Sequence, residues 1–163
     1  MKNVILMLLL LVLTGCASHH KFYDGPKREE SQIVNIQGAE AENKHPLGGG
    51  GWTTIQIRGL NGKEIKPENM KANSVEVLPD TYQVSVMVTN QHYFQTAKFQ
   101  WVAEKGKKYF VNYEAGEGHN NVDVLNIKKV WLEDLSTGEV IKEITGWSEI
   151  KNWMFKSNVT IYI

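Results

Sequence analysis

Apolar and polar residues alternate along most of the chain after Ser31, which is the period of a strand with one packed and one solvated face. The clearest run covers residues 82–89, where Tyr82, Val84, Val86 and Val88 share one face. Shorter runs of the same kind lie at 33–36, 52–57, 75–77, 97–101, 109–113, 122–132 and 140–144. The pattern therefore predicts seven or eight short strands.

Turn signals separate these runs. Asn61-Gly62 favours a tight turn with positive φ and predicts a hairpin or a reversal within residues 52–66. Gly106, the longer loop 116–121 and the stretch 136–138 divide the later strands. Strands at this spacing predict an all-β fold, an antiparallel sandwich or barrel built as a meander of hairpins. We expect residues 31–163 to form this single domain.

The C-terminal part has a different pattern. Trp147, Ile150, Trp153 and Met154 recur at helical spacing and Ser148 can cap a helix, which predicts a short amphipathic helix near residues 147–155. Residues 157–163 alternate again, as a last strand that closes the sheet would. A second interpretation stays open, in which the aromatic side chains form an exposed contact surface for a partner or for lipid headgroups.

The N-terminus has the pattern of a secretory signal. Lys2 precedes ten apolar residues, from Val4 to Leu13, and the small residues Thr14 and Gly15 follow. The apolar run is about half the roughly 20 residues that a membrane-spanning helix needs. We therefore expect residues 1–15 to be a signal peptide and the polar residues 16–30 to be a tether.

The four residues Leu13-Thr14-Gly15-Cys16 resemble the lipobox of bacterial lipoproteins. The resemblance implies cleavage between Gly15 and Cys16, a diacylglyceryl group on the Cys16 sulfur and a fatty acyl chain on the new amino group. About two acyl chains are enough for stable membrane anchoring. Ala17 and Ser18 stand where an Asp would imply retention at the inner membrane, so the resemblance implies the periplasmic face of the outer membrane in a Gram-negative host.

The body of the chain shows a second resemblance, carried by short segments: Tyr23-Asp24-Gly25-Pro26, Gln32-Ile33-Val34, residues 75–86, Gly106-Lys107-Lys108-Tyr109, Trp131-Leu132-Glu133-Asp134 and residues 137–140. These segments are similar to small bacterial lipoproteins that carry a PEGA-type or transthyretin-like β-sandwich. The resemblance implies a β-sandwich and supplies no catalytic residues.

The net charge and the cysteine content argue against two classes of function, nucleic-acid binding and thiol chemistry. Without residues 1–15 the chain has 17 basic and 18 acidic side chains in 148 residues, a net charge near −1. Nucleic-acid binding needs a basic face, so this composition argues against it. Cys16 is the only cysteine, and once it is lipidated no thiol remains for a disulfide or for redox chemistry.

No catalytic motif stands out, and we expect no metal and no cofactor apart from the lipid on Cys16. The glycine run 48–51 opens onto a strand and lacks the Lys-Ser/Thr of a phosphate loop. His119 in a Gly-rich loop is the best candidate for polar chemistry, with Glu117 and Asp123 nearby in the sequence. His19-His20 is interpreted as part of the solvated tether.

Aromatic residues give the candidate binding surface. His92, Tyr93 and Phe94 lie on a hairpin connection, where exposed rings could stack on a sugar or a peptide. The candidate surface is His92, Tyr93, Phe94, His119, Trp147 and Trp153.

These observations favour a membrane-anchored, non-enzymatic envelope lipoprotein that binds or scaffolds an envelope protein or glycan. Two alternatives stay open. One is an inhibitor or immunity-type lipoprotein that blocks an envelope hydrolase through loop 116–121 or loop 45–51. The other is an enzyme that acts on peptidoglycan or lipid through His119.

Overall fold

The computed structural model describes residues 18–43, 51–66, 71–116 and 125–152. They contain twelve strands, one short 3-10 turn and no α-helix, which confirms the all-β prediction. The elements are β1 (Ser18–Lys21), η2 (Glu30–Gln32), β2 (Val34–Gly38), β3 (Glu40–Asn43), β4 (Gly51–Leu60), β5 (Lys63–Glu64), β6 (Asn73–Val77), β7 (Asp80–Thr89), β8 (Tyr93–Ala103), β9 (Lys108–Ala115), β10 (Ile127–Asp134), β11 (Val140–Glu143) and β12 (Lys151–Asn152).

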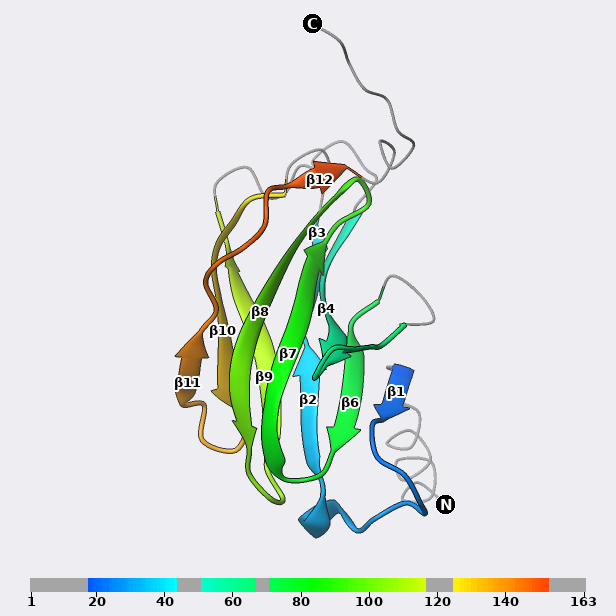
Figure 1. Cartoon of the computed structure of the whole chain (residues 1–163). Coiled ribbons are helices and arrows are strands. Elements are labelled where there is room, and N and C mark those ends of the chain that lie inside the picture. Colours follow the sequence, from blue (N-terminus) through cyan, green and yellow to red (C-terminus); the bar gives the residue numbers. More distant parts are fainter. Residues whose placement is uncertain (1–17, 44–50, 67–70, 117–124, 153–163) are drawn as a thin grey trace, which may run out of the picture.

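The strands form two sheets that pack face to face as a sandwich (Figure 1). The first sheet has the order β1-β6-β2-β9-β10-β11. The second has the order β12-β8-β7-β4-β3, and β5 pairs with β4. Most neighbours are antiparallel, as predicted, but β1 pairs with β6 and β2 pairs with β9 in parallel.

The core lies between the sheets and follows the alternation of the sequence. In β8, Ala97, Phe99 and Trp101 are buried while the residues between them are exposed. The Trp101 ring meets the Tyr109 ring of the opposite sheet edge to face, with centroids 5.1 Å apart at 82°. Contacts of this kind join the two layers and bury the largest side chains.

One continuous segment belongs to both sheets. β2 lies in the first sheet and β3 in the second, with only Ala39 between them. The Ala39 N–H donates to the Val111 carbonyl of the first sheet at 2.9 Å, and its own carbonyl accepts from the Ile55 N–H of the second sheet at 2.8 Å. Gly38 lies directly over the Ile55 backbone, where a Cβ would collide with the carbonyl oxygen. The close approach of the two sheets therefore requires glycine at this position.

The predicted reversal at Asn61-Gly62 is confirmed. It joins β4 to β5 with φ angles of 48° and 79°, the two positive values that this dipeptide favours. The Asn61 side chain also accepts a hydrogen bond from the Gln83 N–H at 2.8 Å, which fixes the turn against β7.

The simple meander prediction is wrong at Gly106. The turn at Gly106 does not form a hairpin between β8 and β9, because these strands lie in different sheets. The Gly106 N–H donates to the Ile33 carbonyl at 3.0 Å, so the connection is held at the end of the first sheet as the chain crosses over.

The tether interpretation is wrong for residues 18–22. Residues 18–21 form β1 on the edge of the first sheet, and the Phe22 N–H donates to the Glu76 carbonyl at 2.8 Å. His20 is half-buried on this strand rather than solvated in a linker. Backbone pairing with β6 needs no apolar side chains, which explains why a polar segment joins the sheet.

The helix predicted near residues 147–155 is also wrong over its described part, residues 147–152. The backbone there is extended, and Lys151–Asn152 form β12 beside Phe94 and Tyr93. Ser148 does not cap a helix, because its N–H donates to the Thr96 carbonyl at 2.8 Å. Pairing with the edge of β8 thus overrides the helical spacing of the aromatic residues.

Candidate functional site

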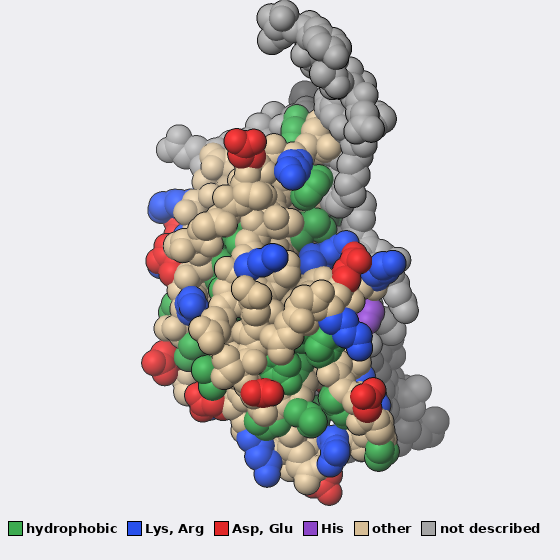
Figure 2. All heavy atoms as spheres, viewed as in Figure 1, with side chains coloured by type: hydrophobic (Ala, Val, Ile, Leu, Met, Phe, Trp, Pro, Cys, Tyr) green, Lys and Arg blue, Asp and Glu red, His purple; other side chains and the backbone are tan. Residues whose placement is uncertain are grey.

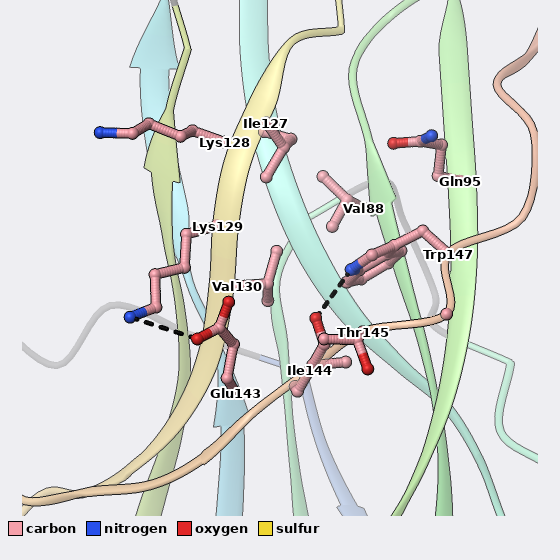
Figure 3. Close-up of a pocket in the computed structure, with 11 residues that line it drawn as sticks. Val88, Gln95, Ile127, Lys128, Lys129, Val130, Glu143, Ile144, Thr145 and Trp147 are labelled. Atoms are coloured by element: carbon pink, nitrogen blue, oxygen red, sulfur yellow. Dashed lines mark hydrogen bonds and ion pairs between the residues drawn. The ribbon is translucent and has the colours of Figure 1, made fainter.

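A cleft of about 270 Å³ opens on the side of the sandwich where β10 of the first sheet and β8 of the second move apart (Figure 3). Residues 144–148, which we call the strap, cross from β11 toward β12 and close one end of it. The Trp147 ring points into this space, opposite Ile127 and Val130 (Figure 3). The cleft is lined by Val88, Gln95, Ile127, Lys128, Lys129, Val130, Glu143, Ile144, Thr145, Gly146 and Trp147.

Hydrogen bonds to both sheets hold the strap in place. Ile144 donates its N–H to the Val130 carbonyl of β10 at 2.9 Å. At the other end, the Ser148 hydroxyl accepts from the Thr96 N–H at 3.0 Å and the Ser148 carbonyl accepts from the Gln95 side chain at 3.1 Å. The Trp147 indole N–H donates back to the Ile144 carbonyl at 3.0 Å, which fixes the ring in its position.

The cleft has an apolar floor and a polar rim. The charged groups at its rim form ion pairs. Lys129 Nζ lies 3.5 Å from Glu143 Oε2, and Lys128 Nζ lies 2.5 Å from Glu114 Oε1. The ammonium groups of both lysines point away from the floor in Figure 3. An aromatic wall beside a surface that is more polar than apolar is suited to a group with one apolar face and several polar atoms, of the size of one side chain or one sugar ring.

The structure brings three of the predicted aromatic residues, Tyr93, Phe94 and Trp147, to the same end of β8. Trp147 on the strap precedes Ser148, which pairs with Thr96, and β12 pairs with Tyr93 and Phe94. All three aromatic side chains are partly buried, and Trp147 and Tyr93 pack against the core.

The hairpin that carries His92 is well ordered by its neighbours. The Asn90 side-chain oxygen accepts from the His92 N–H at 2.9 Å and from the Tyr93 N–H at 2.7 Å, an Asx turn. The His92 and Tyr93 rings meet edge to face with centroids 6.3 Å apart. This connection is therefore a formed turn rather than a freely exposed aromatic loop.

Several predicted site residues lie outside the described residues: Gly15, Cys16, Ala17, His119 and Trp153, with loop residues 45–50 and 117–121. Within the described part, no three His, Cys, Asp or Glu residues gather as metal ligands would. The same part of the chain holds no helix long and apolar enough to cross a membrane.

A buried carboxylate that the sequence did not single out lies at the far end of β10. Asp134 is 2% exposed at its side chain and accepts from the Ser136 hydroxyl at 2.5 Å and the Ser136 N–H at 2.8 Å. Lys107 Nζ lies 3.2 Å away. These hydrogen bonds, with the Lys107 charge, hold the Asp134 pKa below its usual range, and Glu104 and Asp134 together raise the pKa of Lys107. The Ser136-Thr137-Gly138 turn signal was the only hint of this group.

Positive and negative side chains are interspersed on the face of the molecule seen in Figure 2, which agrees with the near-zero net charge. No protein-family model matches the chain, and no curated protein and no solved structure is significantly similar to it. The functional argument therefore rests on the chain's own residues.

Proposed function

We propose that the protein is a lipid-anchored envelope lipoprotein that binds another envelope component, protein or glycan, through the Trp147 cleft. The anchoring part of the proposal rests on the lipobox resemblance of residues 13–16 and on the apolar run before it. The binding part rests on the aromatic-walled cleft and on its nearly neutral rim.

One observation carries the proposal: β1 and the cleft lie at opposite edges of the first sheet. β1 begins at Ser18, two residues after Cys16, so a lipid on Cys16 would hold that edge within roughly 7 Å of the membrane surface. β10 and β11 lie at the other end of the six-strand order (Figure 1). Four strand spacings of about 4.8 Å separate β1 from β10, so the cleft lies roughly 19 Å from the anchored edge across the sheet.

This arrangement favours a binding module over an enzyme. The described residues that line the cleft include no Ser, Cys, His or Asp, and the one carboxylate among them, Glu143, is paired with Lys129. Nucleophilic or acid–base catalysis would need such groups within hydrogen-bond reach of one another. The cleft instead offers apolar contact and a few polar rim groups, which suits recognition.

The test uses the full-length protein in cells of a bacterium with an outer membrane. A photo-crosslinking side chain replaces Lys128 at the cleft rim, or Asp24 in the turn after β1 as the matched control. We expect adducts with an envelope component from position 128 and none from position 24. Trp147→Ala should abolish the adduct while Trp147→Phe, which keeps an aromatic wall, should retain it.

The anchor is tested separately with Cys16→Ser, which should move the protein from the membrane fraction to the soluble fraction. A Cys16→Ser protein that stays in the membrane fraction would remove the anchoring part of the proposal. Equal adducts from positions 128 and 24, or none from position 128, would remove the binding part.

A further inference from the structure

Among the described residues, the outer edge of β8 has no strand beside its second half, and the Gln100 carbonyl there accepts only a side-chain hydrogen bond from Lys142. Thr96 donates its N–H to the Ser148 hydroxyl and accepts from the Ser148 N–H, so its backbone points away from β7. Backbone direction alternates along a strand, so Lys98, Gln100 and Val102 point their N–H and C=O groups to the same side. In the described part of the chain β12 pairs only with Tyr93 and Phe94, and no backbone group pairs with Lys98, Gln100 or Val102 on this side.

Exposed apolar side chains lie on this edge and on the neighbouring β11. Val102 is 60% exposed, and Val140 and Ile141 of β11 are 51% and 44% exposed. Lys142 of β11 reaches across to the Gln100 carbonyl at 3.3 Å, which places the two strands close together. An unpaired edge beside apolar residues is the usual place where an extended segment of another chain adds a strand.

Two lysines at this edge lie without an ion-pair partner among the described residues, although β11 and its flank also carry Glu139 and Glu143. Lys98 and Lys142 have no carboxylate partner in the described part of the chain, whereas Lys129 is paired with Glu143. A second copy is a poor occupant, because a two-fold axis through Gln100 would bring two Lys142 ammonium groups together. An extended segment with carboxylates would instead neutralise both lysines.

We propose that the free edge of β8, at Lys98, Gln100 and Val102, accepts an extended acidic segment of a partner protein as an added strand. The inference goes beyond the proposed function, because it adds a contact site outside the Trp147 cleft and takes the bound envelope component to be a protein. Carboxylates of the segment would lie beside Lys98 and Lys142, and an apolar side chain beside Val102. The N–H and C=O groups of the three β8 residues would pair with its backbone, and the Lys142 ammonium would leave the Gln100 carbonyl to bind a carboxylate of the segment.

The probe is a fluorescent peptide of about eight residues with alternating Glu and Val, compared with the same peptide carrying Lys for Glu. Binding to residues 16–163 is measured by anisotropy and by amide shifts in NMR spectra. Gln100→Pro removes the outward N–H at a position where an edge strand tolerates proline, and Gln100→Ala is its matched control. We expect Gln100→Pro to weaken binding at least about tenfold and Gln100→Ala less than about twofold.

Charge is tested with Lys98→Glu and Lys142→Glu, and we expect each variant to weaken peptide binding at least about tenfold. The control is Lys27→Glu, beyond β1, which changes the net charge equally and should leave peptide binding unchanged. The proposal is overturned if Gln100→Pro binds as the wild type does, if the Lys peptide binds equally well, or if the free protein is a dimer that protects the Gln100 amide. Peptide shifts confined to the strap would also overturn strand addition and leave the cleft proposal standing. Loss of the crosslinks from position 128 with the amide shifts intact would defeat only the cleft proposal.

Discussion

Gly38 lies against the backbone of Ile55, where the chain passes from one sheet to the other, and its lack of a side chain allows the two sheets to meet. We expect Gly38→Ala to lower the free energy of unfolding by about 3 kcal/mol or more, because a Cβ would force the Ile55 carbonyl to move. Chemical denaturation measures this change.

Gly138→Ala is the control for that substitution. Gly138 has a φ of +71° but nothing within 4 Å of an added Cβ, so only the backbone conformation opposes alanine. We expect a cost of about 1 kcal/mol. Equal losses for the two variants would show that the close approach at Ile55 does not limit stability.

The side chain of Asn73 on β6 hydrogen-bonds the backbone of Ile57 on β4, a strand of the other sheet. Its side-chain oxygen accepts from the Ile57 N–H at 2.7 Å and its amide donates to the Ile57 carbonyl at 2.9 Å, in a fully buried place. We expect Asn73→Ala to cost about 2–4 kcal/mol, because two buried backbone groups lose their partners. Gln37→Ala on the outer face of β2 should change the unfolding free energy by less than about 0.5 kcal/mol, and a similar loss there would contradict the argument.

Because of Asp134, we expect the free energy of unfolding to fall when the pH becomes acidic. Its pKa is lower in the folded protein than its ordinary value of 3.8, because Ser136 donates two hydrogen bonds and Lys107 supplies positive charge. The carboxylate therefore stabilises the fold above the ordinary pKa, and this contribution is lost as the pH falls through the lower, folded value. Asp134→Asn should be less stable at pH 7 by about 1–3 kcal/mol.

The same variant should lose less stability than the wild type when the pH falls below about 4. Urea denaturation at several pH values follows both curves. Parallel curves for the wild type and Asp134→Asn below pH 4 would show that this carboxyl does not titrate with an altered pKa.

Trp101 is 2% exposed and its indole N–H has no hydrogen-bond acceptor among the described residues. Trp101→Phe removes this unpaired donor and keeps an aromatic ring for the edge contact with Tyr109. We expect a loss of less than about 1.5 kcal/mol, well below the 3–5 kcal/mol typical when a buried Trp is replaced by Ala. Thermal unfolding of the Phe and Ala variants compares the two, and equal losses would show that the retained aromatic ring does not preserve the packing against Tyr109.

The alternating pattern predicts the strands because the contact of each side chain with the core is a local property with a period of two. It does not predict which sheet a strand joins. The connection at Gly106 has the residues of a hairpin turn, and only the long-range pairing of β9 with β2 and β10 shows that the chain crosses over. β1 lacks an apolar pattern altogether, because its pairing with β6 is made by the backbone.

The site was predicted only in part for a similar reason. Trp147 stands out as an aromatic residue near the end of the chain, but its helical spacing with Ile150 suggested the wrong backbone. Ser148 pairs with Thr96, 52 positions earlier in the chain. The spacing of apolar residues along the sequence carries no information about such a long-range contact. Ile127 and Val130 line the cleft opposite Trp147, but their pattern in the sequence predicts only a strand and gives no sign of a cleft.

The parallel pairing of β2 with β9 also sets the order in which the protein can fold. Val34 and Ile36 belong to the first strand of the core, yet Ile36 pairs with Tyr109, more than 70 positions later in the chain. The strands β4, β7 and β8 pair through shorter separations and can assemble earlier, because closing a short loop costs less entropy. The first sheet therefore waits for most of the chain to be synthesised, and a growing chain that has not reached Val111 keeps an apolar strand without its final neighbour.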